Sequence, residues 1–388
     1  MNKRKDFLPY CKPFSDDDEI NRVTDVIRSG WWTKGSETRD FEQCFADYVG
    51  AKYAVAVNSC TAAMHIALLA AGIGRGDEVI STPMTFCSTV NNIVHTGARP
   101  VLVDIDRRTG LIDPDKIEAA ITDKTKAIVP VHYAGQSCDM DAINDIADRH
   151  GLFVLEDAAH GLSTEYKGKR VGGMGNATAF SFYVTKNIST AEGGMLTTDD
   201  KELYEKASVL SLHGMSRNAW ARYGSKGDWK YEVTAPGFKY NMTDIAAALG
   251  MAQMQKLDEM QAIRAEYAAM YNSAFDEIDG ITYLKDNGYG KISNHLYVIM
   301  VDNEKFTIDR DEFIQQLHEY NIGTSVHFIP VCMHPYYIET YGYKSGDFPQ
   351  TEKMFEQIIS LPLYPSMSRE DVLYVIEAVQ EIAAKYAK

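Results

Sequence analysis

The stretch YAVAVNSCTAAMHIALLAAG (Tyr53–Gly72) joins a strand pattern to a helix pattern. YAVAV is a short apolar run, and TAAMHIALLAAG repeats its apolar residues with the spacing of a helix. Further strand-like runs follow, each bounded by turn or helix material: EVIST (78–82), PVLVDID (100–106), KAIVPVHY (126–133) and LFVLED (152–157). Apolar strands that alternate with helices predict an α/β domain with a largely parallel sheet covered on both faces.

The pattern changes at Thr243, where one long helical stretch begins. It runs to Phe275, with Thr243 and Asp244 as capping residues. After it come the strand-like NHLYVIMV (294–301), the amphipathic DRDEFIQQLHEYN (309–321) and a helix pattern after Ser368. We therefore expect residues 1–252 to form a large α/β domain and residues 253–388 a smaller C-terminal α+β domain, with the long helix between them.

Composition and charge exclude several classes of partner. The 388 residues are 45% hydrophobic and 24% charged, as in an ordinary globular chain. A formal charge of -15 argues against nucleic acid or an anionic membrane as a general partner. The six cysteines form no CxxC pair and have no histidine at metal-ligand spacing, so neither a disulfide framework nor a metal site is predicted. Without a secretory signal or an apolar run of about 20 residues, we expect a cytoplasmic protein.

Two segments carry candidate chemistry. LFVLEDAAH (152–160) ends a strand in Glu156 and Asp157, with His160 following, and ligands of parallel sheets bind at the carboxyl ends of strands. An aspartate there also suits the cap of the next helix. SFYVTKNISTAEGG (181–194) places Lys186 after a strand-like run, where desolvation makes a lysine nucleophilic. A lysine by itself is more often a solvated surface group.

Together the two segments suggest pyridoxal phosphate (PLP) as a cofactor. PLP needs a lysine for its Schiff base and an acid that keeps its ring nitrogen protonated, so that the ring accepts carbanion electrons. NSCTAAM (58–64) supplies a turn into a helix N-terminus, which favours an anion such as the cofactor's phosphate. The hydroxyl of Ser181 adds a further phosphate donor.

A series of spaced motifs then covers nearly the whole chain, from Ser29 to Pro365. They are SGWWTKG, SCTAAMHIAL, PMTF, VHYAG, EDAAH, SFYVTKN with AEGG, PGFKYNMTDIAAALG and SLPLYP. In these motifs the chain resembles the DegT/StrS family of nucleotide-sugar aminotransferases. The resemblance implies the aspartate-aminotransferase fold (PLP fold type I) and a homodimer whose active sites are built from both subunits.

The resemblance also implies roles for individual residues. Lys186 is implied as the Schiff-base lysine and proton shuttle, Asp157 as the partner of the pyridine nitrogen, and His160 as a neighbour of the cofactor's phenolic oxygen. The remaining implied cofactor contacts are Thr61 and Ala62 through backbone N–H groups, Ser181 through its hydroxyl, Asn241 from the neighbouring subunit, and Phe86 stacked on the ring. Ordinary structural roles also suit several of them, such as a core aromatic for Phe86 or a helix cap for Asn241.

For the substrate, the resemblance implies transfer from L-glutamate, which leaves as 2-oxoglutarate, to a UDP-linked 4-keto sugar. A 4-keto pentose is favoured, and a 2-acetamido-4-keto-6-deoxyhexose is next. The candidate substrate contacts are Trp31, Thr33, Lys34, Tyr183, Arg217, Lys239, His327 and His334. Tyr183 and Lys34 depart from the family pattern, where many relatives have histidine and a small polar residue, and both are expected at the mouth of the active site.

Three other functions compete with this hypothesis. The glycine cluster GGMGN (172–176) suggests a nucleotide-binding oxidoreductase, but it lacks the order of the dinucleotide fingerprint, and we interpret it as a loop. A non-catalytic PLP-binding regulator would need a DNA-binding module or basic patch, which the sequence does not show. A PLP-dependent dehydratase or an amino-carbocycle synthase of the same family stays open. The dehydratase branch replaces the Schiff-base lysine with histidine, so Lys186 favours transamination.

Overall fold

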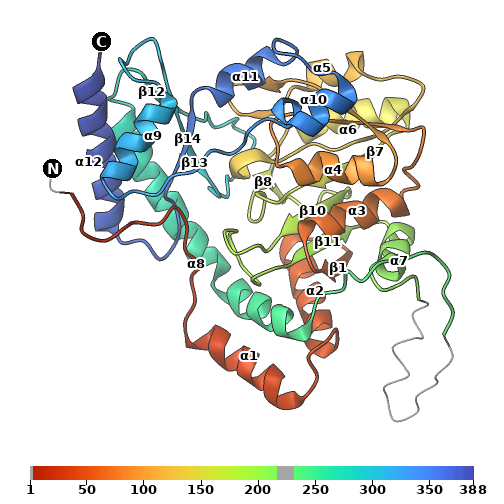
Figure 1. Cartoon of the computed structure of the whole chain (residues 1–388). Helices are drawn as coiled ribbons and strands as arrows, with labels where there is room; N and C mark the ends of the chain where they lie inside the picture. Colours follow the sequence, from red (N-terminus) through yellow and green to blue (C-terminus); the bar gives the residue numbers. More distant parts are fainter. Residues whose placement is uncertain (1–2, 216–230) are drawn as a thin grey trace.

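The structure, a computed structural model, describes residues 3–215 and 231–388 (Figure 1). Arg217, a predicted substrate contact, lies outside these ranges. The chain forms a large α/β unit, a smaller C-terminal unit and the long helix α8 (Asp244–Phe275), which connects them. None of the helices in the described ranges combines the length and the apolar character that a membrane span requires.

The large unit is built on a seven-stranded sheet. In spatial order its strands are β1 (Tyr53–Val57), β11 (Gly194–Thr198), β10 (Ala177–Ser181), β7 (Phe153–Asp157), β6 (Thr125–Ile128), β2 (Glu78–Ser81) and β3 (Arg99–Leu102). β11 is antiparallel to both of its neighbours, and every other pair is parallel. The prediction of a largely parallel sheet is confirmed.

Helices cover both faces of this sheet, as the apolar strands predict. On one face, apolar residues of α3 (Cys60–Ala70) and α7 (Lys201–Leu210) pack against alternate strand residues such as Leu155 and Leu196. The other face packs against α2 (Ser36–Val49), α6 (Met140–His150) and part of α8, through residues such as Phe45 and Phe180. The remaining elements of the large unit are α1 (Asp17–Ser29), α4 (Cys87–His95), α5 (Pro114–Ala119), the 3-10 turn η1 (Tyr133–Gly135), and the short pairs β4 (Ile105–Asp106) with β5 (Leu111–Ile112) and β8 (Glu165–Tyr166) with β9 (Lys169–Arg170).

The C-terminal unit has its own sheet and core. Its three antiparallel strands are β12 (Ile281–Tyr283), β13 (Tyr297–Val301) and β14 (Ile358–Leu361), and α9 (Arg310–Glu319) and α12 (Arg369–Tyr386) pack with them. Thr243 caps α8, and α12 follows Ser368, both as the sequence predicts, and Ser368 is the cap of α12. Figure 1 shows α8 lying beside α1 and α2 at one end and beside α12 at the other.

Each unit also contains a segment from the other part of the chain. Leu8, near the N-terminus, pairs with Ile322 and belongs to the core of the C-terminal unit. In the other direction, η3 (Val331–Met333), α10 (Pro335–Tyr341) and α11 (Pro349–Phe355) return to the large unit, where Asp104 accepts three hydrogen bonds from Gln350 and Thr351. The division of the chain near residue 252 therefore stays a prediction.

Candidate active site

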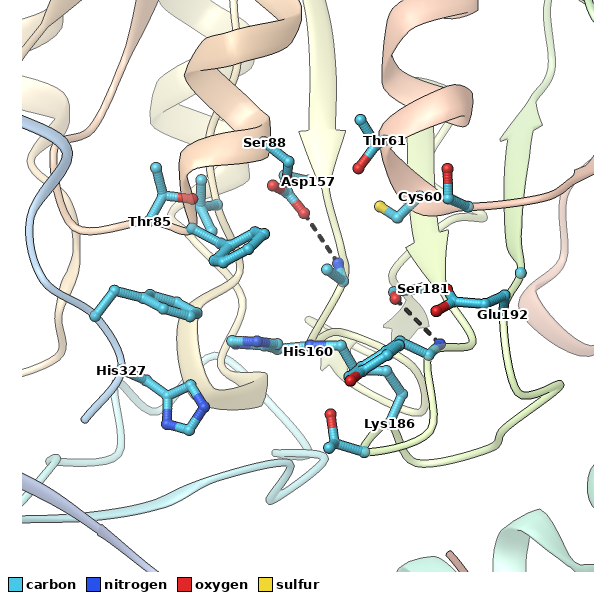
Figure 2. Close-up of a pocket in the computed structure, with 18 residues that line it drawn as sticks. Cys60, Thr61, Thr85, Ser88, Asp157, His160, Ser181, Lys186, Glu192 and His327 are labelled. Atoms are coloured by element: carbon cyan, nitrogen blue, oxygen red, sulfur yellow. Dashed lines mark hydrogen bonds between the residues drawn. The ribbon is translucent and has the colours of Figure 1, made fainter. Parts of the chain in front are cut away.

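A pocket of about 500 Å³ opens at the carboxyl ends of β7 and β10. Asp157 and Ser181 are the last residues of these two strands, and Lys186 lies in the loop after β10. The N-terminal end of α3 contributes Thr61, and the C-terminal unit contributes His327. Figure 2 shows Thr61 and His327 on opposite sides of the cavity, with Asp157 and Lys186 between them. The sequence predicted this edge of the sheet for a ligand.

Asp157 is a buried carboxylate that is held in place by hydrogen bonds. It is 4% exposed, and it accepts from Thr89 Oγ1 at 2.7 Å and from the backbone N–H of Ala159 at 3.1 Å. Burial raises the pKa of this carboxyl. Its neighbour Glu156 points to the other face of the strand, where it bonds to His132 and Asn176. Of the two acids, only Asp157 lines the pocket.

Lys186 presents an amine with a perturbed pKa to the same pocket. Burial lowers the pKa of this amine to about 8. Its Nζ lies 3.5 Å from Nε2 of His295, a residue that no motif pointed to. An amine with such a pKa has a much larger unprotonated fraction near neutral pH than an ordinary lysine, and the unprotonated amine is the nucleophilic form.

The N-terminal end of α3 faces the pocket and carries groups that suit an anion. Ser59 caps the helix, and its Oγ accepts the backbone N–H of Ala62 at 3.0 Å, so this donor is used within the cap. Thr61 is exposed and lines the pocket together with Ser181. A helix N-terminus with a serine hydroxyl nearby suits a phosphate group.

Gly194, the first residue of β11, packs directly against the N-terminal end of α3. A Cβ atom built on Gly194 would lie 2.4 Å from the backbone nitrogen of Cys60. No side chain fits there, so the second glycine of the AEGG motif allows the start of β11 to touch the first turn of α3. This contact fixes where the anion site lies relative to the strand ends.

Aromatic rings form the wall on the side of the C-terminal unit. The His160 ring stacks on Phe328 at 5.7 Å between centroids, and Phe328 also contacts Phe86 at 5.9 Å. His160 Nδ1 accepts the backbone N–H of Ala134 at 3.3 Å. Burial lowers the pKa of His160 well below its usual value, so its imidazole is neutral. Phe86 is 58% exposed at the pocket rim, with room for a flat ligand beside it.

The predicted substrate contacts divide into those at the pocket and those away from it. Tyr183 and His327 line the pocket. Five others do not line the part of the pocket that the described residues of one chain form: Trp31, Thr33, Lys34, Lys239 and His334.

Lys34 was predicted at the active-site mouth and Asn241 as a phosphate contact from the neighbouring subunit, and neither lines the described part of the pocket of its own chain. The Lys34 ammonium is paired with Glu42 at 2.5 Å, although its predicted place was at this mouth. Asn241 lies outside its own chain's pocket and donates to the carbonyl of Met242, and its Oδ1 is buried with no hydrogen-bond partner among the described residues.

The residues of this pocket fit PLP. The buried carboxylate of Asp157 suits a protonated ring nitrogen, the amine of Lys186 suits an aldehyde, and the end of α3 suits a phosphate. The mixed sheet with a smaller C-terminal unit is the aspartate-aminotransferase fold. Fold and site together define the class as PLP-dependent enzymes of fold type I.

Comparison with known proteins identifies the family. Residues 13–380 match the DegT/DnrJ/EryC1/StrS aminotransferase family, so this chain belongs to that family. It is 57% identical over 383 residues to the spore coat polysaccharide biosynthesis protein SpsC of Bacillus subtilis, covering 98% of both chains.

Solved structures agree with this assignment. Spr1654 from Streptococcus pneumoniae, described as a sugar aminotransferase and solved in its PLP form, has a TM-score of 0.91 and 34% identity, with 98% of this chain and 99% of that chain covered. Helicobacter pylori PseC, an aminotransferase of pseudoaminic acid biosynthesis, has a TM-score of 0.91 and 31% identity, with 98% and 100% covered. The protein is thus a PLP-dependent sugar aminotransferase, as the sequence motifs predicted.

Proposed function

We propose that the protein transfers the amino group of L-glutamate to the 4-keto carbon of a UDP-linked sugar. A 4-keto pentose is the first candidate, and a 2-acetamido-4-keto-6-deoxyhexose is the second. The observation that carries the proposal is the meeting of Lys186 and Asp157 in one pocket beside an anion-binding helix end. The relative SpsC is named for spore coat polysaccharide, which supports a role for the product in a cell-surface polysaccharide.

When bound, PLP supplies an aldehyde that captures amines and a ring that accepts electrons from the substrate carbon. Lys186 holds the cofactor through its amine and, once released, carries a proton between the substrate carbon and the cofactor. Its lowered pKa lets the amine act as a base near neutral pH. Asp157 would keep a proton on the ring nitrogen through its negative charge, and its bonds from Thr89 and Ala159 hold the carboxylate in place for this.

Other residues bind and orient the cofactor. The first turn of α3 at Thr61, together with the Ser181 hydroxyl, holds the phosphate. Ala62 contributes through the cap that shapes this turn, because its own N–H donates to Ser59. Phe86 and neutral His160 both line the pocket, where Phe86 would cover one face of the ring and His160 would lie beside the phenolic oxygen.

We further propose that the working enzyme is a homodimer and that Asn241 reaches the phosphate in the partner subunit's pocket. Its place outside its own chain's pocket supports this role, in which an amide N–H of Asn241 would donate to the phosphate. Trp31 and Trp32 are 38% and 55% exposed, and large apolar side chains of this kind suit a surface that a second copy or the sugar nucleotide covers. Thr33, Lys239 and His334 are proposed substrate contacts on the same assembly.

The test is mass spectrometry of reactions that contain the protein, PLP, L-glutamate and a panel of UDP-linked and dTDP-linked 4-keto sugars. Amination of the UDP-linked pentose supports the first candidate, and preference for the acetamido hexose supports the second. Lys186→Ala is the control, and we expect its turnover to fall by at least about 10³-fold, because both the attachment and the proton carrier are lost. Multiple turnovers by this variant, or conversion of no sugar by the wild type, would contradict the proposal.

A further inference from the structure

His295 touches two groups of the site without lining the pocket. It is 5% exposed, and its Nε2 lies 3.5 Å from Lys186 Nζ. Its ring also lies 4.4 Å from the ring of His160. The cofactor roles proposed above leave this residue without a task.

A chain of buried amides determines which nitrogen of His295 carries the proton. Gln261 Nε2 donates to the carbonyl of Ile292, so Gln261 Oε1 is the acceptor for Asn187 Nδ2 at 3.3 Å. Asn187 Nδ2 also donates to the carbonyl of Ser293 at 3.1 Å. Asn187 Oδ1 is therefore an acceptor, and at 2.9 Å from it His295 Nδ1 must be the donor. In a neutral imidazole this leaves a lone pair on Nε2, the atom that faces Lys186.

The surroundings keep His295 neutral. Burial comes first, and the basic groups that face it add to the effect, each of which disfavours a positive charge on His295 when it carries one itself: Lys186 in the loop after β10, His160 after β7, Arg264 on α8 and His327 from the C-terminal unit. Together they lower the pKa of His295 well below its usual value. The groups that face the Lys186 amine and favour its charge are Cys60, Asp157 and Cys11. A lone pair on His295 is thus present whether or not Lys186 carries a proton.

We propose that His295 is a positioning residue for Lys186, with its unprotonated Nε2 accepting a hydrogen bond from the lysine amine each time that amine is free of the cofactor. The inference rests on the proposed role of Lys186. A released lysine has a flexible stem with many rotamers, and a fixed acceptor limits the positions that it samples. The amine then stays near the carbon to which it returns a proton.

Two variants of His295 separate this role from simple packing, because each keeps one of its two bonds. His295→Asn places an amide near the position of Nδ1, which retains the bond to Asn187 and loses the acceptor for Lys186. His295→Gln reaches the position of Nε2 with its oxygen, which retains that acceptor and loses the bond to Asn187. Thermal unfolding of both variants checks that each is folded.

The first measurement is the glutamate half-reaction of the holoenzyme, followed by the absorbance of the cofactor. We expect His295→Asn to slow it about tenfold, the effect of losing one hydrogen bond to a charged group, and His295→Gln to stay within about twofold of the wild type. Equal slowing in both variants, or a slower Gln variant, would overturn the proposal.

The second measurement needs neither glutamate nor a sugar. In the cofactor-free full chain, the rate at which an acylating reagent labels Lys186 is followed against pH. Because an acceptor stabilises the ammonium more than the free amine, the titration should move to lower pH in His295→Asn and stay in place in His295→Gln. Identical profiles in all three proteins would overturn the inference. If the wild type aminates none of the sugars, the proposed function fails, and the labelling still decides the role of His295.

Discussion

The floor and the mouth of the pocket are built in different ways. At the floor, Asp157 and His160 are 4% and 6% exposed, and each is held by hydrogen bonds within this chain. At the mouth, Phe86 and Tyr183 are 58% and 46% exposed. The floor is complete in one chain, whereas the mouth leaves apolar surface for a ligand or a second chain to cover. We infer that the chemistry is determined by the floor and the choice of sugar by the mouth.

The largest effect within this comparison is expected at the floor, from Asp157→Asn. The amide keeps the shape of the side chain but removes the charge that holds a proton on the ring nitrogen, so the ring becomes a weak electron sink. We expect turnover to fall by about 10² to 10³-fold, as for the loss of one electrostatic partner of a reacting group. Single-turnover kinetics with glutamate measure this.

Asp104→Asn is the matched control for Asp157→Asn. Asp104 is another buried carboxylate, 5% exposed, and it holds α11 far from the cofactor groups. We expect this variant to lose stability and keep its turnover. Near-normal turnover in Asp157→Asn would contradict the proposed pairing of Asp157 with the ring nitrogen.

The sequence predicted the floor well because its chemistry depends on local motifs. The strand ending at Asp157, the Lys186 loop and the helix after Ser59 each follow from a pattern within a few residues, and they meet because strand ends share one edge of a sheet. His295 was missed, since its position depends on bonds to Asn187 and Lys186, more than 100 residues away along the chain. No local pattern indicates such a contact.

The sequence was less informative about the segment before α2. Lys34 was expected at the mouth, which stays a prediction, and no local pattern indicated its ion pair with Glu42, eight residues further on. Thr243 and Asp244 were both expected as capping residues of α8. Thr243 has that role, whereas Asp244 accepts from Gly35 and Thr38 at the start of α2. Because Gly35 has no side chain to cap α2, a carboxylate from another helix supplies the acceptor. Contacts between distant segments of this kind are set by tertiary packing.

Asp244→Ala tests whether the buried contacts between α8 and the start of α2 contribute to stability without contributing to turnover. Its Oδ1 accepts from the backbone N–H of Gly35 at 2.7 Å, and from Thr38 N–H and Oγ1 at 3.0 and 2.6 Å. Removing a buried charged acceptor should lower the free energy of unfolding by about 2 kcal/mol. Denaturant unfolding measures this, with Asp40→Ala on the exposed side of α2 as the control. The folded fraction should keep its turnover. A loss of turnover without a loss of stability would contradict a purely structural role for Asp244.

A smaller effect is expected from Gly194→Ala, at the contact between the start of β11 and the first turn of α3. The added Cβ would lie 2.4 Å from the backbone nitrogen of Cys60, so the first turn of α3 must move. Overpacking of this kind costs about 1 to 3 kcal/mol, and we expect PLP affinity to fall by about tenfold. Titration of the cofactor-free protein with PLP measures it. Gly74→Ala, whose Cβ would meet only the carbonyl of Thr96 at 3.9 Å, should bind PLP normally.

The smallest effect is expected at the mouth, from Tyr183→Phe. The Tyr183 side chain lines the pocket and is 46% exposed, so its hydroxyl can offer the sugar nucleotide one hydrogen bond that is shared with water. Losing such a bond costs about 0.5 to 1 kcal/mol, which raises the KM for the sugar about two- to fivefold. Because the floor is intact, the glutamate half-reaction and PLP affinity should not change. Steady-state kinetics with each substrate separate the two effects, and a slower glutamate half-reaction would place Tyr183 in the chemistry of the floor rather than in the choice of sugar.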